Sequence, residues 1–250
     1  MINFFKKLSK KSFDPSLENA LPTLLDENAP FRVKEAFRNL KVVLTVTTPK
    51  NEGGAAITVT SSWPAEGKST IAVNSAVMFT KSNAKVVLVD ADLRRGKLAK
   101  LFSEKSKPGL SDYIVGDVEY SDIIRPVAAY PGLSYIARGT KTDAAYELLE
   151  SQKMKDLIKK LKAEYDYVII DTPPLLSVSD ALAIAPETDG TVLVARHKFT
   201  NEKDIEESID LLKYFKANVL GVAVNDHVED KLSRKHKSGL YYYYSDYTAK

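Results

Sequence analysis

The stretch SSWPAEGKST, residues 61–70, decides the fold of this chain. It follows a short apolar, β-branched run at 56–60 and precedes a helical pattern that begins at Ser69. A strand, a loop of small residues ending in Gly-Lys-Ser-Thr, and a helix together are typical of the phosphate-binding P-loop. Ser62 stands where the simple motif has its first glycine. The context on both sides favours a P-loop over an ordinary strand–helix turn.

Such a loop binds phosphate because its backbone N–H groups and the N-terminus of the following helix present positive partial charge. Lys68 should span the β- and γ-phosphates, and the Ser69 hydroxyl should bind Mg²⁺. The motif therefore predicts ATP and Mg²⁺ as cofactors. The expected nucleotide-binding residues of the loop are Ala65, Glu66, Gly67, Lys68, Ser69 and Thr70.

Short runs rich in valine and isoleucine alternate with helical patterns on both sides of this loop. Continuously apolar strands between amphipathic helices indicate a parallel sheet that is covered on both faces. The sequence predicts an α/β fold with a doubly wound, mostly parallel sheet. The expected strands are 56–60, 85–89, 167–170, 190–195 and 219–224, with a sixth at 133–136, and the expected helices are 31–44, 69–80, 146–163, 179–185 and 202–215.

Three aspartates stand at the ends of predicted strands. Asp90 and Asp92 flank a single residue after the second strand, so both side chains should point into the crevice where such sheets bind ligands. Asp171 ends the strand at 167–170, as a Walker B aspartate does. Carboxylates that converge beside a polyphosphate need a divalent cation, and Mg²⁺ is the expected ion. We expect Ser69, Asp90 and Asp171 to hold it.

Composition excludes several classes of protein. The 36 basic and 33 acidic residues give a net charge of +3, which is too mild for a nucleic-acid-binding protein. The absence of cysteine excludes disulfides, thiolate metal sites, cysteine nucleophiles and a cluster-bearing nitrogenase-type reductase. No run approaches the ~18 apolar residues of a membrane span, and the first residues lack the apolar core of a secretory signal.

The chain divides into three expected segments. Residues 1–30 mix charges and prolines without periodicity, which is typical of an extended arm. Residues 31–230 should form the P-loop domain. Residues 231–250 should form a flexible tail, in which a basic run at 231–237 precedes a tyrosine cluster.

Five of the 13 tyrosines lie in the last ten residues. Adjacent aromatic residues in a terminal tail bury nothing, and the structural alternative is a β-edge strand or a sticky patch. As kinase substrates they would each gain nearly two negative charges, which changes what the tail can bind. We interpret them as phosphoacceptors: Tyr241, Tyr242, Tyr243, Tyr244 and Tyr247.

Three stretches together resemble the Walker A, A′ and B motifs of bacterial tyrosine kinases: SSWPAEGKST, VDADLRR at 89–95 and IIDTPP at 169–174. The chain is similar to the separate-polypeptide form found with capsule and exopolysaccharide assembly systems of Gram-positive bacteria, from about Phe31 to its end. It departs from the family at Ala65, in place of a P-loop glycine, and at Gly96, in place of a proline. If the backbone at position 65 has φ > 0, alanine strains it by about 1 kcal/mol.

The resemblance implies a protein-tyrosine kinase that phosphorylates its own C-terminal tyrosines in trans and regulates polysaccharide synthesis and export. Lys68 would stabilise the transferring phosphoryl group. Either Asp92 or Asp90 would receive the tyrosine proton, and the sequence leaves the choice open. Asn225 is the implied contact to adenine.

Subunit contacts and partners follow from the same resemblance. Glu35, Arg38 and Lys41 match the family's Glu-x-x-Arg-x-x-Arg motif, with lysine in the final place, and are spaced to form one charged ridge on a helix. The implied assembly is a homo-oligomeric ring. The implied partners are a transmembrane activator with a cytoplasmic tail, a cognate phosphotyrosine phosphatase and other protein substrates. The implied location is cytoplasmic, at the inner face of the membrane.

Two other functions remain open from the residues. A switch ATPase related to chromosome-partitioning and division-site proteins would hydrolyse ATP with water, but it would carry a lysine where this chain has Trp63. A nucleotide sensor that regulates polysaccharide assembly by binding alone is the second alternative.

Overall fold

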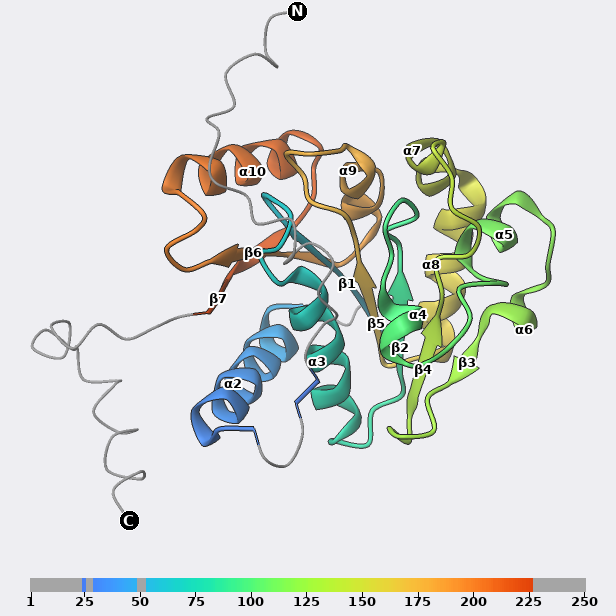
Figure 1. Cartoon of the computed structure of the whole chain (residues 1–250), viewed down its shortest axis with the longest axis horizontal. Helices are drawn as coiled ribbons and strands as arrows, with labels where there is room; N and C mark the ends of the chain where they lie inside the picture. The colour runs from blue at the N-terminus through green and yellow to red at the C-terminus, as the bar shows by residue number, and fades with distance from the viewer. Residues whose placement is uncertain (1–23, 26–28, 49–52, 227–250) are drawn as a thin grey trace, which may run out of the picture.

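The computed structural model describes residues 24–25, 29–48 and 53–226, so most of the expected arm at 1–30 and the whole expected tail at 231–250 lie outside the described residues. Seven strands form one sheet in the order β3-β4-β2-β5-β1-β6-β7 (Figure 1). All neighbours pair in parallel except β3 and β4. The strands are β1 Ala55–Ser61, β2 Val86–Asp90, β3 Arg125–Pro126, β4 Leu133–Ile136, β5 Tyr167–Asp171, β6 Gly190–Arg196 and β7 Val219–Asn225.

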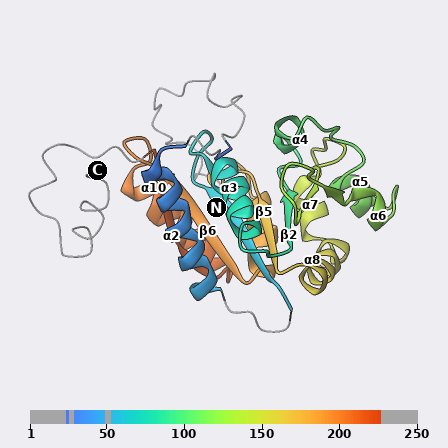
Figure 2. The ribbon, with the colours of Figure 1, turned by 90° about the horizontal axis from the view of Figure 1, so that it is seen from below.

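Helices cover both faces of this sheet, which confirms the doubly wound fold. In Figure 1, α2 and α3 lie below the strands, while α9 and α10 lie above them; Figure 2 shows α2 and α3 side by side. The helices are α2 Phe31–Thr47, α3 Lys68–Thr80, α4 Leu98–Leu101, α5 Leu110–Val115, α6 Tyr120–Ile123, α7 Ala145–Glu150, α8 Gln152–Glu164, α9 Asp180–Ile184 and α10 Glu202–Tyr214, with a 3₁₀ turn at Ala185–Glu187.

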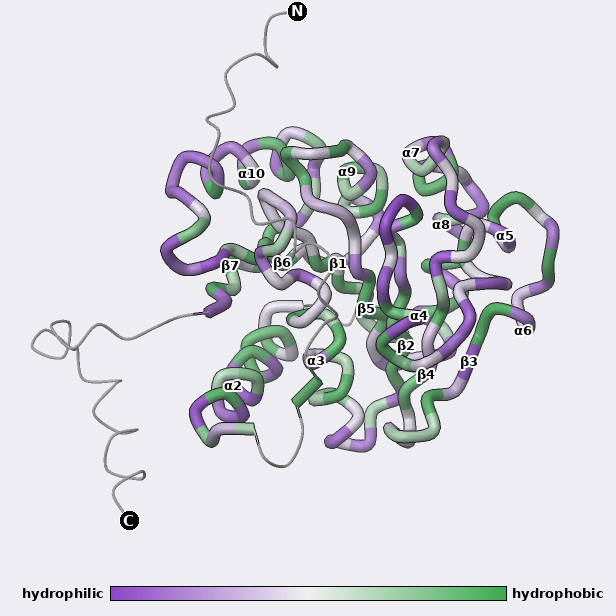
Figure 3. Tube along the Cα trace, in the orientation of Figure 1, coloured by the Kyte–Doolittle hydropathy of each residue, from purple (hydrophilic) through white to green (hydrophobic). Residues whose placement is uncertain are grey.

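The apolar core is divided by the sheet because strand side chains alternate between its faces. On the α3 side, Ile57 packs with Phe79, whose ring stacks on that of Tyr167 at a centroid separation of 3.7 Å. On the opposite side, Val87 packs with Leu157 of α8. The central strands β2 and β5 are correspondingly buried along their whole length, and they are mostly hydrophobic before the aspartate that ends each of them (Figure 3). The continuous burial of these strands explains why their sequences show no alternation.

All six predicted strands are present, and the strand predicted at 133–136 coincides with β4. The antiparallel edge strand β3 and the short helices α4 to α6 were not predicted. The helix predicted over 146–163 is wrong as a single element, because it is interrupted at Ser151. The Ser151 hydroxyl donates to Leu148 O at 2.7 Å and accepts from Met154 N at 3.3 Å, so it ends α7 and caps α8.

Helix α2 continues to Thr47, beyond the predicted end at residue 44. Its last turn is β-branched, which disfavours helix in isolation. Leu44 is buried against the core, and the hydroxyls of Thr45 and Thr47 each donate to a backbone carbonyl four residues earlier at 2.8 Å. Tertiary packing therefore overrides local propensity here. Within the described residues, no helix has the length and apolarity needed to cross a bilayer.

Candidate functional site

The sheet register brings the three motif-bearing strands together. β5 lies between β1 and β2, and Asp171 is the register partner of Val59 on one side and of Asp90 on the other. Ala91 N donates to Asp171 O at 2.9 Å, which extends the pairing one residue beyond β2. The P-loop and both carboxylate motifs therefore leave the same edge of the sheet at adjacent positions, as predicted.

The P-loop turns sharply into α3. Ala65 has φ 63° and Gly67 has φ 93°, both in the left-handed region. The positive φ of Gly67 would strain any other residue, and a Cβ added there would lie 2.0 Å from the Asn225 side-chain amide nitrogen, which would have to move. In the described structure no side chain caps α3, whose first N–H groups are thus available to an anion.

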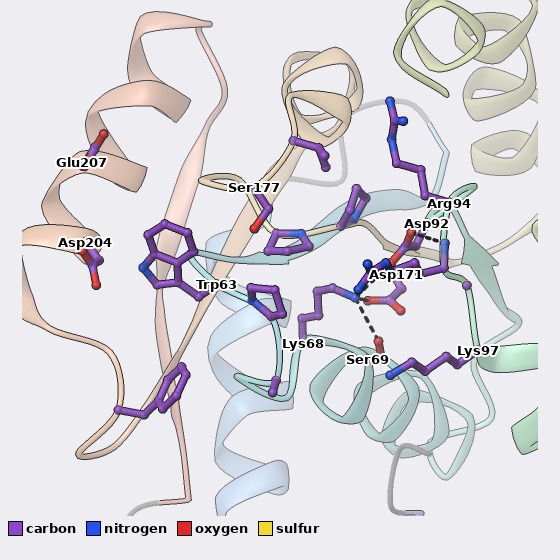
Figure 4. Close-up of a pocket in the computed structure, with 18 of the residues that line it drawn as sticks. Trp63, Lys68, Ser69, Asp92, Arg94, Lys97, Asp171, Ser177, Asp204 and Glu207 are labelled. Carbon is purple, nitrogen blue, oxygen red and sulfur yellow. Dashed lines mark hydrogen bonds and ion pairs between the residues drawn. The ribbon is translucent and has the colours of Figure 1, made fainter. Parts of the chain in front are cut away.

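Lys68 is the centre of the charged groups. Its Nζ lies 3.7 Å from Asp171 Oδ1, 3.8 Å from Asp92 Oδ2 and 3.2 Å from Ser69 Oγ (Figure 4). Burial works to lower the pKa of Lys68, but Asp171, Asp92 and Asp90 together raise it above its ordinary value. The lysine is therefore a permanent cation at neutral pH, as phosphate binding requires.

Asp90 forms no ion pair with Lys68 in the described structure and accepts a hydrogen bond from another segment. Its Oδ2 accepts a hydrogen bond from Leu98 N at 3.2 Å, and a Cβ at Gly96 would lie 2.5 Å from both of its carboxylate oxygens. Burial raises the pKa of Asp90 well above its usual range, and the charges of Asp171 and Asp92 add to this. Gly96, one of the departures from the family, thus makes room for the Asp90 carboxylate. The structure groups Asp92 and Asp171 around the lysine amine.

The predicted Mg²⁺ site fits the residues present. Asp171 Oδ1 is buried without a hydrogen-bond partner, and the Ser69 hydroxyl lies beside the same lysine. No three His, Cys, Asp or Glu side chains are arranged around a common metal position in the described residues. Mg²⁺ normally uses one or two protein ligands and completes its shell with phosphate oxygens and water. Ser69 and Asp171 meet that requirement. The third predicted ligand, Asp90, also has a buried carboxylate oxygen, Oδ1, without a hydrogen-bond partner, so its role in metal binding stays a prediction.

A cavity of about 1050 Å³ extends from these groups in two directions. One end is basic and includes Arg94 and Lys97 (Figure 4). The other end passes Trp63 and reaches Asp204 and Glu207 on α10. The sequence analysis did not assign residues to this second end; the only signal was the tryptophan at the position of the switch-ATPase lysine.

An ion pair that the sequence analysis did not predict fixes the basic end. Arg94 Nε lies 2.7 Å from Asp180 Oδ2, and Arg94 Nη2 lies 3.1 Å from Asp180 Oδ1, a bidentate geometry. Asp180 is fully buried at the start of α9. The pair fastens the segment after β2 to the helix that follows the Walker B strand.

The side chain of Glu66, one of the residues expected to bind nucleotide, does not line the cavity. Glu66 is fully buried: Oε2 accepts from Trp63 N at 2.9 Å, and the Thr200 hydroxyl donates to Oε1. Its carbonyl oxygen accepts from the Asn225 amide at 3.0 Å. Burial raises the pKa of Glu66 to about 7, although the two donors work in the opposite direction. Glu66 therefore joins the P-loop to the segment between β6 and α10.

The remaining predicted residues lie apart from this cavity. Asn225 donates to Glu66 O of the P-loop, as described above. Glu35 and Arg38 form an ion pair on α2, while Lys41 donates to the Ser82 hydroxyl at the end of α3. The five predicted phosphoacceptor tyrosines lie outside the described residues.

Fold and site define a P-loop nucleotide-binding α/β domain, and the AAA domain family matches residues 55–219. The tyrosine-protein kinase ptk of Acinetobacter johnsonii is 33% identical over 208 residues, 82% of this chain. The kinase domain of the Escherichia coli tyrosine kinase ETK has a TM-score of 0.72 at 30% identity, with 82% of this chain and 79% of that domain covered. The chain belongs to the bacterial tyrosine-kinase family.

Coverage differs among the relatives. The chain spans 28% of the length of ptk. The putative tyrosine-protein kinase CapB of Staphylococcus aureus is 28% identical over 225 residues, which are 90% of this chain and 96% of CapB. The septum site-determining protein MinD of Pyrococcus horikoshii, solved with Mg-ADP, has a TM-score of 0.61 at 23% identity over 71% of this chain, a likeness of fold alone.

The positive φ of Ala65 predicts that Ala65→Gly stabilises the protein. Alanine in the left-handed region costs about 1–2 kcal/mol, which glycine would relieve. Glycine also increases the conformational entropy of the unfolded chain, which offsets part of this stabilisation. We expect the free energy of unfolding in urea to rise by about 0.5–1 kcal/mol. The matched control Ala163→Gly, at an exposed position of α8, should lower it by a similar amount. If Ala65→Gly is also less stable than the wild type, the inference that the backbone at Ala65 is strained is wrong.

The raised pKa of Glu66 predicts a pH-dependent stability. Its folded-state pKa of about 7 exceeds the reference value of 4.5, so the folded state holds the proton more tightly. The free energy of unfolding should therefore fall as the pH rises through this window, by about 3 kcal/mol from this group.

Glu66→Gln should remove most of that fall, measured by urea unfolding at about pH 5 and about pH 8. The control Glu202→Gln, an exposed residue of α10, should keep the wild-type dependence. An unchanged pH dependence in Glu66→Gln would show that the carboxylate is not desolvated.

Proposed function

We propose that this chain is an ATP- and Mg²⁺-dependent protein-tyrosine kinase that autophosphorylates its C-terminal tyrosines and regulates capsule or exopolysaccharide synthesis and export. The observation that carries the proposal is the placement of Lys68 between Asp92 and Asp171 beside the uncapped N-terminus of α3. A buried cation beside free N–H groups suits the phosphates of a nucleotide. Membership of the tyrosine-kinase family supplies the reaction class.

Phosphoryl transfer at this site depends mainly on positioning and charge. The tyrosine oxygen attacks the γ-phosphorus, the bond to the β–γ bridging oxygen breaks, and ADP leaves. Lys68 stabilises the charge of the transferring group. Ser69 and Asp171 would hold Mg²⁺, which offsets phosphate charge when bound. The tyrosine proton goes to Asp92 in this proposal, because Asp92 lines the cavity and Asp90 does not.

The acceptor is the tail of a neighbouring subunit, and residues 31–230 form the kinase domain. Assembly through α2 is supported by its exposed apolar side chains, which lie beside the ridge of Glu35, Arg38 and Lys41. The exposed valines include Val42 and Val46 of α2, and Val222 and Val224 of the edge strand β7 add to them. Uncovered apolar side chains on adjacent elements favour a homo-oligomeric contact.

The proposed partners follow from the family. A membrane protein with a cytoplasmic tail activates the kinase and holds it at the inner face of the membrane. A phosphotyrosine phosphatase reverses the modification. Adenine lies near Asn225, which contacts the P-loop at Glu66 O.

The switch-ATPase alternative has less support, because Trp63 replaces its lysine and the likeness to MinD is confined to the fold. The product formed from labelled ATP separates the candidates. Phosphotyrosine identifies the kinase, free phosphate identifies the ATPase, and no product identifies a nucleotide sensor.

The metal role of Asp171 predicts the behaviour of Asp171→Asn. Loss of a metal-directed charge should weaken nucleotide binding in the presence of Mg²⁺ by roughly tenfold, while binding in EDTA changes much less. A fluorescent ATP analogue measures both. Asp210→Asn, on the exposed face of α10, is the matched control. Equal losses with and without the metal would make Asp171 a structural residue.

The proposed reaction predicts transfer between subunits. A Lys68→Met chain alone should carry no phosphotyrosine, because the transferring group loses its cation. When it is mixed with an active chain lacking residues 231–250, it should gain phosphotyrosine, detected by mass spectrometry. Phosphotyrosine on the Lys68→Met chain alone, in cells free of other tyrosine kinases, would contradict the assignment.

The same mixture tests the subunit contact. Replacing Glu35, Arg38 and Lys41 together by alanine should abolish both oligomers and the transfer. If the triple variant assembles and its tails are modified at the normal rate, the ridge is only a solvated face.

A further inference from the structure

The segment after β2 brings a second lysine, Lys97, to the cavity that contains Lys68. Lys97 is half-buried and belongs to the basic end of the cavity. In Figure 4 its side chain extends from that segment toward Ser69. The charges of Lys68, Asp92 and Asp171 all act on the pKa of Lys97, so its amine lies in the field of the same groups.

The backbone on both sides of Lys97 is fixed by the two aspartates that follow β2. Gly96 N donates to Asp92 O at 2.7 Å, and Leu98 N donates to Asp90 Oδ2 at 3.2 Å. The Leu98 side chain is fully buried in the core, which anchors the start of α4. The position of Lys97 at the cavity is therefore set by the fold, and its side chain can adjust to a ligand.

The Lys97 amine makes no hydrogen bond or ion pair with the described residues, whereas its neighbour Arg94 is held by Asp180. Burial and then the charge of Lys68 lower the pKa of Lys97, while the two aspartates beside Lys68 work in the opposite direction. Two cations held near each other in a partly buried site repel each other in the free protein. An anion bound between them would remove that repulsion.

The order of the strands indicates which part of a nucleotide Lys97 would meet. Asn225, the proposed adenine contact, ends β7, whereas Lys97 follows β2, on the other side of β1 and β5. Lys68 and Ser69, the expected phosphate contacts, begin α3 after β1, which lies between β2 and β7 in the sheet. A nucleotide with its base toward β7 therefore directs its terminal phosphate toward Lys97.

The charges around Lys68 also favour a second cation. Asp171 and Asp92 share the Lys68 amine at 3.7 and 3.8 Å. One lysine therefore faces two carboxylates in addition to the charge of a terminal phosphate. During phosphoryl transfer this charge spreads over the three outer oxygens of the group, so cations from two different segments can stabilise it together.

We propose that Lys97 is a second phosphate-binding lysine, whose amine binds the terminal phosphate of ATP and stabilises the phosphoryl group during its transfer. The proposal rests on the proposed nucleotide-dependent function of the cavity. The bonds that form and break are those given above, and the tyrosine proton still passes to Asp92. Lys97 donates hydrogen bonds and neither gains nor loses a proton. ADP lacks the group that Lys97 binds, so this residue should make the cavity prefer ATP to ADP.

The experiment compares the affinities of two nucleotides for the full chain after phosphatase treatment, which keeps its tail unmodified. Isothermal titration calorimetry in Mg²⁺ measures the Kd of ADP and of AMP-PNP, a non-hydrolysable analogue of ATP. Lys97→Gln should weaken AMP-PNP binding by roughly tenfold and ADP binding by less than about twofold, because only the analogue has a terminal phosphate.

Two further variants serve as controls. Lys97→Arg keeps the positive charge and should bind AMP-PNP more tightly than Lys97→Gln does. Lys100→Gln changes an exposed lysine of the same segment that does not line the cavity, and it should leave both Kd values unchanged. Equal losses for AMP-PNP and ADP in Lys97→Gln, or no loss for either nucleotide, overturn the proposal.

The reaction rate tests the role in transfer. An active chain lacking residues 231–250 modifies the Lys68→Met chain, and Lys97→Gln in the active chain should lower the initial rate at saturating ATP by roughly tenfold. An unchanged rate at saturation overturns the role in transfer, because Lys97 would then bind the ground state and the transition state equally.

Stability and wild-type activity separate the remaining explanations. Because Lys97 has no partner among the described residues, Lys97→Gln should unfold at the same temperature as Lys100→Gln or above it. A lower unfolding temperature would make Lys97 a structural residue and overturns the proposal. If the wild-type chain forms no phosphotyrosine, the proposed kinase function fails, but the two Kd values still decide whether Lys97 binds a terminal phosphate.

Discussion

The attraction between Lys68 and its carboxylates is the constraint on which the site depends. Asp171 and Asp92 hold the amine at 3.7 and 3.8 Å, and neither charge is well solvated. Breaking such a group by removing one partner leaves an uncompensated buried charge, which is strongly unfavourable. The sheet register places Asp171 beside Lys68, so the position of the lysine amine depends on the arrangement of the strands. Nucleotide phosphates would enter a site whose charges are already in place.

Sequence periodicity predicted the central sheet because buried parallel strands are apolar throughout and bounded by polar loops. It did not predict the break at Ser151. Serine is not a helix breaker such as proline or glycine, and Ser151 separates the two helices through the hydrogen bonds of its hydroxyl. Motif spacing predicted that Lys68, Asp92 and Asp171 lie together, and the structure brings both carboxylates within ion-pair distance of the lysine amine. It missed the pairing of Arg94 with Asp180, since the two residues are 86 positions apart and meet only in the folded chain.

The two departures from the family have different physical consequences. Ala65 keeps the left-handed loop conformation at a cost in backbone strain. Gly96 removes a side chain that would occupy the position of the Asp90 carboxylate. The first affects the stability of the loop, while the second leaves room for a buried carboxylate. Neither consequence follows from the motif alone, because both depend on where the backbone lies.

Trp63 has a further consequence. It is the chain's single tryptophan, and it lines the cavity between Lys68 and α10. Indole emission depends on the polarity and the charges around the ring. All tryptophan fluorescence of this protein therefore arises from the wall of this cavity. Nucleotide or acceptor entering that space should be visible in the unlabelled protein, without a signal from elsewhere in the chain to subtract.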